Sequence, residues 1–145
     1  MIFLDTGFIF ALVCSHDASH LRVRRNIAEY KGRDLSQLLL TTNHVVEETI
    51  TLLRSRGHRD ADVAHDLAVR VGRRLFSGAL ARVHHATVEE EHAAFEYLAA
   101  RRDKRYSLTD CLSFVIMDAY HITEALSVDE DFSHRFMSRP GPPKH

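Results

Sequence analysis

The hydrophobic positions along the chain form short apolar runs separated by longer amphipathic stretches. The short runs predict strands at residues 2–4, 38–42, 80–84 and 125–128. Apolar residues at helical spacing predict helices at residues 8–14, 20–30, 44–56, about 60–76, 87–99, 107–117 and about 130–137. Strands that alternate with helices over this length predict an α/β fold with a mostly parallel sheet covered on both faces.

The predicted helix at residues 107–117 is apolar on nearly every side, so it belongs in the interior of the domain. Asp110 lies in its first turn. An ionised carboxylate is rarely buried unless it is paired or bound to a metal. Asp110 therefore indicates that other charged groups or a cation meet it in the interior.

Three other acidic residues stand close to strand ends. Asp5 ends the first apolar run, Asp129 follows the fourth, and Glu48 lies in the helix directly after the second. In an open α/β sheet, ligands bind outside the carboxyl ends of the strands. We therefore expect these three acids to converge with Asp110.

The composition suits one globular domain. The chain has 145 residues, 45% of them hydrophobic, and we expect a single domain over residues 1–137. Residues 138–145 hold all three prolines and are predicted to form an irregular tail. The net charge of -1 excludes a general attraction to nucleic acid or membrane, so any such binding depends on how the charges are distributed.

Cysteine usage and hydropathy indicate an intracellular protein. Cys14 and Cys111 lie far apart in apolar surroundings, which is typical of small buried residues and compatible with a reducing cytoplasm. The N-terminus does not resemble a signal peptide, and no apolar run approaches the ~18 residues of a membrane span. We expect a cytoplasmic protein that does not insert into membranes.

A cluster of Asp and Glu without Cys or His favours Mg²⁺ or Mn²⁺ over Zn²⁺, because hard cations prefer oxygen ligands. Without a metal, such carboxylates repel one another and raise their own pKa values, which costs stability and favours a functional explanation. The reaction that this cluster supports best is hydrolysis of a phosphodiester, in which a metal activates a water and stabilises charge on the oxygens.

Each acid also has a local explanation. Asp110 follows Ser107 by three residues, which is the spacing of a helix capping box. Asp5 and Asp129 could simply form turns, and Asp131 could favour the dipole of the last helix. Glu48 could be a solvent-exposed helix residue. The joint pattern favours a shared site.

Four segments of the chain resemble the PIN-domain family, in particular the single-domain ribonucleases of the VapC toxin type. The segments are Ile2-Phe-Leu-Asp5-Thr-Gly, Thr41-Thr-Asn-His-Val-Val-Glu-Glu48-Thr-Ile-Thr-Leu-Leu, Ser107-Leu-Thr-Asp110-Cys-Leu-Ser-Phe and Ala125-Leu-Ser-Val-Asp129-Glu-Asp131-Phe. They occur in the family's order and span nearly the whole chain. The resemblance implies a three-layer α/β/α sandwich with a central mostly parallel sheet of four to five strands, and Mg²⁺- or Mn²⁺-dependent hydrolysis of RNA.

The resemblance also assigns the acids. Asp5 matches the first catalytic acid of the family, Asp110 the acid that opens its buried helix, and Asp129 the fourth. Glu48 matches the second acid better than Glu47, because Glu48 directly precedes the Thr-Ile-Thr-Leu-Leu run, although helical periodicity does not distinguish the two. The implied metal ligands are Asp5, Asp110 and Asp129, with Asp131 as an additional ligand or as a substitute for Asp129.

Small polar residues and a basic group complete the implied site. Positions that are polar in the family hold Thr6, Asn43 and Ser127, which would orient carboxylates or waters by hydrogen bonding unless they are plain surface residues. Four cations directly before the buried helix would contact RNA phosphates or else form a solvated face: Arg101, Arg102, Lys104 and Arg105.

Other chemistries lack their motifs. The 11 histidines do not show zinc-site spacing, and the chain has no His-Glu-x-x-His, Gly-x-Ser-x-Gly or Gly-Lys-Ser/Thr motif. A haloacid-dehalogenase-like phosphatase needs a second Asp two residues after the first, where Gly7 stands. A receiver domain needs an acceptor Asp at a mid-chain strand end, which Glu48 on a helix does not match.

The toxin resemblance implies a cognate antitoxin protein and a homodimer as partners, besides the RNA substrate. The alternative is a non-catalytic PIN-fold module that binds RNA or a protein. A degenerate scaffold would be expected to have lost at least one acid. Catalysis is therefore favoured by the presence of all four: Asp5, Glu48, Asp110 and Asp129.

Overall fold

A five-stranded sheet forms the centre of the computed structural model, which describes residues 1–144. The strands lie in the order β3-β2-β1-β4-β5. All four neighbouring pairs are parallel, so every strand ends at the same edge of the sheet. Their bounds are β1 (Ile2–Leu4), β2 (Leu39–Thr42), β3 (Arg82–His84), β4 (Glu124–Ser127) and β5 (Met137–Pro140).

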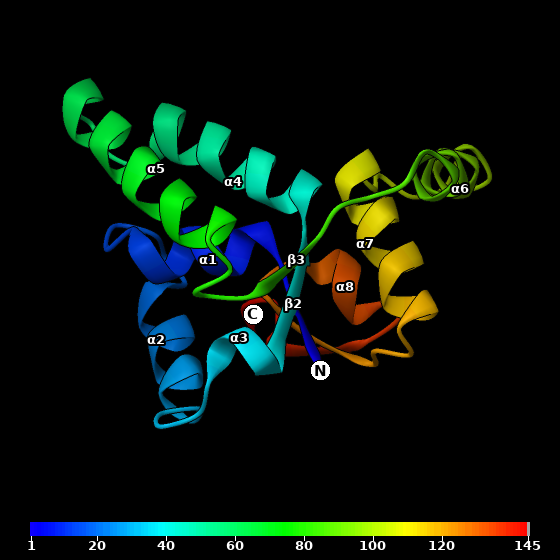
Figure 1. The fold of residues 1–145 in the computed structure, drawn as a ribbon, viewed down its shortest axis with the longest axis horizontal. Helices are drawn as coiled ribbons and strands as arrows, with labels where there is room; N and C mark the ends of the chain where they lie inside the picture. Colours follow the sequence, from blue (N-terminus) through cyan, green and yellow to red (C-terminus); the bar gives the residue numbers. More distant parts are fainter. Residues whose placement is uncertain (145) are drawn as a thin grey trace.

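Helices cover both faces of this sheet. Their bounds are α1 (Thr6–Val13), α2 (His20–Ala28), α3 (Leu35–Leu38), α4 (Asn43–Arg56), α5 (Ala61–Phe76), α6 (Val88–Ala99), α7 (Leu108–Ala119) and α8 (Glu130–Ser133). Figure 1 shows α1, α2 and α5 on one side of the strands, and α6 and α7 on the other. The predicted three-layer α/β/α sandwich is confirmed.

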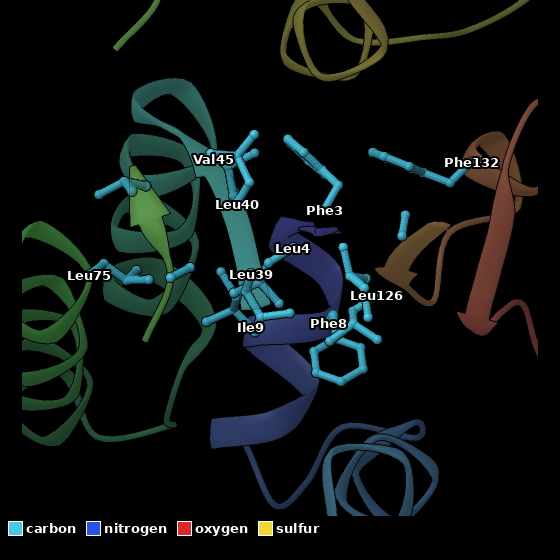
Figure 2. Close-up of a cluster of buried hydrophobic side chains, with 14 of the residues drawn as sticks. Phe3, Leu4, Phe8, Ile9, Leu39, Leu40, Val45, Leu75, Leu126 and Phe132 are labelled. Atoms are coloured by element: carbon cyan, nitrogen blue, oxygen red, sulfur yellow. The ribbon is translucent and has the colours of Figure 1, made fainter. Parts of the chain in front are cut away.

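The central strands β1 and β2 are buried along their whole length, because helices cover both sides of a parallel sheet. This explains why their sequences are apolar runs without alternation. Phe3 of β1 stacks with Phe132 of α8, at 6.1 Å between the ring centroids. Figure 2 shows both rings gathered in one cluster with Ile9 of α1 and Val45 of α4.

The predicted interior helix is α7, and most of its surface is buried. Phe114 lies among four aromatic rings, with centroid distances of 5.1 Å to Tyr106 and Phe132, 5.7 Å to Phe136 and 6.0 Å to Tyr97. These rings come from the loop before α7, from α8, from the segment before β5 and from α6. Phe114 therefore joins four parts of the chain around the helix that carries Asp110.

The C-terminal segment differs from its prediction. The sequence predicts a helix to about residue 137 and an irregular tail over residues 138–145, but α8 ends at Ser133 and residues 137–140 form β5. The helix prediction is therefore wrong after Ser133, and the prediction of an irregular tail is wrong for residues 138–140. His145 lies outside the described residues. β5 pairs only with β4, and Pro140 is tolerated because an edge strand has one side without ladder hydrogen bonds. The sheet continues past residue 137, the predicted end of the domain.

The bounds of three other strands shift by one or two residues, and β4 spans Glu124–Ser127 where residues 125–128 are predicted. β2 begins at Leu39 because the residues before it form the short helix α3, whose first turn is capped by the side chain of Asp34. β3 begins at Arg82, after its predicted start at residue 80. The carboxyl ends of β2 and β3 lie where the sequence predicts them, and that of β4 lies one residue earlier.

Two predictions from composition concern the cysteines and membranes. Cys14 and Cys111 are both buried and free, as predicted. Within residues 1–144, no helix has the length and hydropathy needed to cross a membrane. The buried thiols pack as small apolar groups, and burial raises the pKa of each to about 11.

Phe114→Ala is expected to lower the free energy of unfolding by about 3–5 kcal/mol, because it leaves a cavity among the surrounding rings. Phe95→Ala is the matched control. Phe95 is 56% exposed on α6, so its removal should cost less than about 1 kcal/mol. Urea denaturation measures both variants, and equal losses would contradict the central packing role of Phe114.

Candidate active site

The carboxyl edge of the sheet gathers residues from distant parts of the chain. Asp5 follows β1, Ser127 ends β4, and Asp110 lies in the first turn of α7. Figure 1 shows β2 leading directly into α4 at this edge. α7 and α8 lie on the side of the strands away from α5. Because parallel strands end together, short connections after β1 and β4 are sufficient to bring these side chains close.

Asp5 is buried at the end of β1, with 4% of its surface exposed. Its backbone N–H donates to the carbonyl oxygen of Leu126 at 3.1 Å, and Ser127 Oγ donates to its Oδ2 at 3.0 Å. Burial is the main cause that raises the pKa of Asp5 to about 7, and the charges of Asp110 and Asp129 add to this effect. Asp5 therefore lies close enough to both acids for their charges to interact.

Asp110 forms the capping box that its spacing from Ser107 predicts. Its Oδ2 accepts from the Ser107 N–H at 2.9 Å, and its own N–H donates to Ser107 Oγ at 3.0 Å. Burial is the main cause that raises the pKa of Asp110 to about 6, the Ser107 hydrogen bonds oppose it, and the charges of Asp129 and Glu48 add to it. Asp110 thus both caps α7 and belongs to the acidic group.

Asp110, Asp129 and Asp131 each offer a carboxylate oxygen, and the three oxygens lie within 4.8 Å of one another. Hard divalent cations bind oxygens at about 2.0–2.6 Å, so opposite ligands of one ion lie up to about 5 Å apart. The three oxygens therefore fit around a single cation. Asp5, also predicted as a ligand, lies outside this closest group but is connected to it through Ser127, whose Oγ accepts from the Asp129 N–H at 3.0 Å.

Asp131 joins the group from the first turn of α8. Burial and the charge of Asp129 raise the pKa of Asp131, whereas the charges of His134 and Lys104 lower it. His134 Nδ1 lies 4.0 Å from Asp131 Oδ1. His134 is not among the residues predicted for the site, although its position three residues after Asp131 in a predicted helix is a signal for such contact.

Glu48 approaches the acids from α4. Its charge is among the main causes that raise the pKa of Asp110. Glu47 and Glu48 both line a groove of about 500 Å³ beside Thr109. The interaction with Asp110 favours Glu48 as a neighbour of the acidic group.

The three predicted polar residues have different surroundings. Ser127 contacts Asp5 directly, as described above. Asn43 Oδ1 accepts from the Ala86 N–H at 2.9 Å, so it holds the loop before α6 and hydrogen-bonds to none of the acids within residues 1–144. Thr6 Oγ1 is buried and has no hydrogen-bond partner among the described residues. Buried hydroxyls are usually satisfied, so a bound water or ion is the expected partner of Thr6.

The predicted basic group reaches the acids at one point. Lys104 lies close enough to Asp131 to lower its pKa. Arg101 instead lies over the Tyr97 ring of α6, at 4.3 Å from its centroid, and Arg102 and Arg105 are exposed. Of these four cations, Lys104 therefore interacts electrostatically with the acidic group.

Comparisons with known proteins match nearly the whole chain. The family model described as PIN domain matches residues 2–135. The 23S rRNA-specific endonuclease VapC20 from two strains of Mycobacterium tuberculosis is 37% identical over 134 residues, which are 92% of this chain and 92% of that protein. The crystal structure of Mycobacterium tuberculosis VapC20, described as a Sarcin-Ricin loop cleaving toxin, superposes with a TM-score of 0.79 at 33% identity, covering 92% of this chain and 94% of the other.

Asp5→Asn is expected to change how stability depends on pH in the presence of a chelator. The pKa of Asp5 is raised from 3.8 to about 7 in the folded chain, so the folded state holds this proton more tightly than the unfolded state. The free energy of unfolding of the wild type should fall as pH rises from about 4 to about 7, because the Asp5 carboxylate must then be buried with its charge. At pH 8 the variant should be more stable by on the order of 4 kcal/mol, and near pH 4 the difference should be small.

Urea denaturation across pH 4 to 8 measures this effect. Asp66→Asn is the control, because Asp66 is exposed on α5 and should show no such difference between low and high pH. A wild-type protein whose stability does not decrease relative to Asp5→Asn as pH rises would contradict the raised pKa of Asp5.

Proposed function

This chain belongs to the PIN-domain family, and from this premise we propose that it is an endoribonuclease of the VapC toxin type, which hydrolyses phosphodiester bonds of RNA. The observation that carries the proposal is the convergence of Asp110, Asp129 and Asp131 oxygens within 4.8 Å, beside the buried Asp5. Four acids with mutual charge interactions cost stability in the free protein, which a purely structural role does not explain.

The residues present fit a divalent cation, for which we propose Mg²⁺ or Mn²⁺. Every candidate ligand is a carboxylate, which suits hard cations, and the buried Thr6 hydroxyl lacks a partner among the described residues. Asp110, Asp129 and Asp131 would hold the ion, with Asp5 close by. When bound, it would lower the pKa of an attacking water and stabilise negative charge on the phosphate.

The chain's own residues orient the acids. Ser127 donates to Asp5 and accepts from the Asp129 backbone, while Ser107 and Asp110 bond each other in both directions. Hydrogen bonds of this kind keep ligands in one orientation, and removing them typically costs roughly 10- to 100-fold in metal affinity or activity. Lys104, beside Asp131, is the cation best placed to contact a substrate phosphate.

The relatives support a proposal for the substrate and the partners. The name of the Mycobacterium tuberculosis relative specifies 23S rRNA, and its crystal structure is described as that of a Sarcin-Ricin loop cleaving toxin. We propose a structured RNA loop of this kind as the substrate of this chain. The proposal extends to a cognate antitoxin protein, a homodimer and a cytoplasmic location.

Asp5→Asn should abolish cleavage of a synthetic 23S rRNA sarcin-ricin loop, with a loss of at least about 100-fold. Wild-type protein should cleave the loop with Mn²⁺ or Mg²⁺ and not with a chelator, as followed by gel electrophoresis of end-labelled RNA. The variant should still bind the RNA. If wild-type protein binds RNA or a protein but cleaves no RNA with either metal, the chain is a non-catalytic module.

Glu48→Gln and Glu47→Gln form a matched pair, because both residues are exposed on α4 and line the same groove. Glu48→Gln should reduce the cleavage rate by roughly 10- to 100-fold, since the charge of Glu48 is among the main causes that raise the pKa of Asp110. Glu47→Gln should remain within about threefold of wild type. The reverse order of effects would reassign the second acid to Glu47.

A further inference from the structure

A second hollow, separate from the acidic group, lies between α2 and the segment that follows β5. Its volume is about 510 Å³. We call it the basic hollow, and its lining consists of Arg22, Arg25, Asn26, Glu29, Pro140, Pro142, Pro143 and Lys144. None of these residues lines the groove beside Glu48.

The lining of the basic hollow is positively charged, although the chain carries a net charge of -1. Three cations face one acid, Glu29, and within residues 1–144 no carboxylate lies within 4.0 Å of Arg22, Arg25 or Lys144. Arg22 and Arg25 stand three residues apart on α2, so they are neighbours on one face of the helix. Like charges in this arrangement favour binding of an anion between them.

Arg22 is held in a fixed orientation by the C-terminal segment. Its Nη2 donates to the Gly141 carbonyl oxygen at 2.7 Å, and its Nη1 donates to that of Pro142 at 3.3 Å. A guanidinium has five N–H donors in a planar fork, so three remain after these two bonds. A planar donor group of this kind matches the oxygens of a phosphate.

Asn26 adds a neutral polar group to the same wall. It is 8% exposed, and its Oδ1 has no hydrogen-bond partner among the described residues. An amide can donate to a phosphate oxygen or accept from a hydroxyl such as the ribose 2′-OH. Asn26 lines the basic hollow, so its side-chain N–H groups are the part of the amide that can donate to a phosphate oxygen there.

The basic hollow begins at the edge of the sheet that carries the acids. The Gly141 N–H donates to the Ser127 carbonyl oxygen at 3.0 Å, and Ser127 Oγ donates to Asp5. Arg22 in turn binds Gly141. A strand of RNA that reaches the acidic group can therefore extend along this edge and place another phosphate between α2 and the C-terminal segment.

We propose that the basic hollow is a phosphate subsite, which holds the RNA backbone at a distance from the bond that is cleaved. Its preference for phosphate rests on Arg22, Arg25 and Asn26 alone. The identification of that phosphate as part of RNA rests on the proposed function. The subsite adds affinity and orients the substrate, and it takes no part in the chemical step.

Arg25→Gln tests the subsite, with Arg24→Gln as the matched control. Both arginines are exposed on α2 and each substitution removes one charge, but only Arg25 lines the basic hollow. The measurement is fluorescence anisotropy of a labelled single-stranded RNA with the full chain, in chelator and over a series of salt concentrations. Arg25→Gln should weaken binding about tenfold and reduce the salt slope by about 0.7, whereas Arg24→Gln should leave both nearly unchanged.

Inorganic phosphate provides an independent probe by NMR. It should shift the side-chain amide signals of Asn26 in wild-type protein and not in Arg25→Gln. Equal effects of the two substitutions on RNA binding would overturn the proposal in favour of general electrostatic attraction. Phosphate binding without an effect of Arg25→Gln on RNA would overturn the assignment to RNA, as would a hexaglutamate peptide that shifts the Asn26 signals when RNA does not.

The subsite and the nuclease can fail separately, because binding is measured without a divalent metal. Cleavage by wild-type protein combined with equal effects of the two substitutions would leave the nuclease and remove the subsite. A selective effect of Arg25→Gln in a chain that cleaves no RNA would leave the subsite and remove the nuclease. Both variants should melt within about 2 °C of wild type, since neither side chain is buried.

Discussion

The burial of several carboxylates close together at one edge of a parallel sheet imposes a large electrostatic cost on this fold. Burial and neighbouring charges raise the pKa of Asp5 to about 7 and that of Asp110 to about 6. The fold offsets part of this cost by placing these acids and Asp129 in the first turns or N-cap positions of α7, α1 and α8. Helix N-termini favour negative charge through their free N–H groups and dipole. The remaining cost is what a cation would remove.

The layered fold was predictable because the sequence patterns of its central elements are simple. Strands that are covered on both faces have continuous apolar runs, as in β1, and a helix buried on all sides has no polar stripe, as in α7. β5 has neither signal. Met137 and Arg139 are exposed, and Pro140 argues against a strand unless its place at the edge of the sheet is already known.

The candidate site was predictable in its main acids and not in its details. Asp5 and Asp129 come together because β1 and β4 are neighbouring parallel strands that end at the same edge. The Ser107 spacing gives Asp110 its orientation whether Asp110 is only a helix cap or also part of the site. Which glutamate interacts with Asp110 depends on distance in three dimensions, which periodicity does not contain. The hydrogen bond from the Ala86 N–H to Asn43 Oδ1 also depends on distance in three dimensions, because the local sequence does not determine where the loop before α6 lies.

The pairing of β5 with β4 has a consequence for when the site can form. The Gly141 N–H, which donates to the Ser127 carbonyl oxygen at the end of β4, lies more than a hundred positions after Asp5 in the sequence. The same is true of the β5 residues that pair with β4. Translation delivers the N-terminal part of a chain first. A nascent polypeptide still attached to the ribosome therefore contains Asp5 long before Ser127 is held in place beside it. The complete acidic group forms only after β5 has been synthesised and has paired with β4.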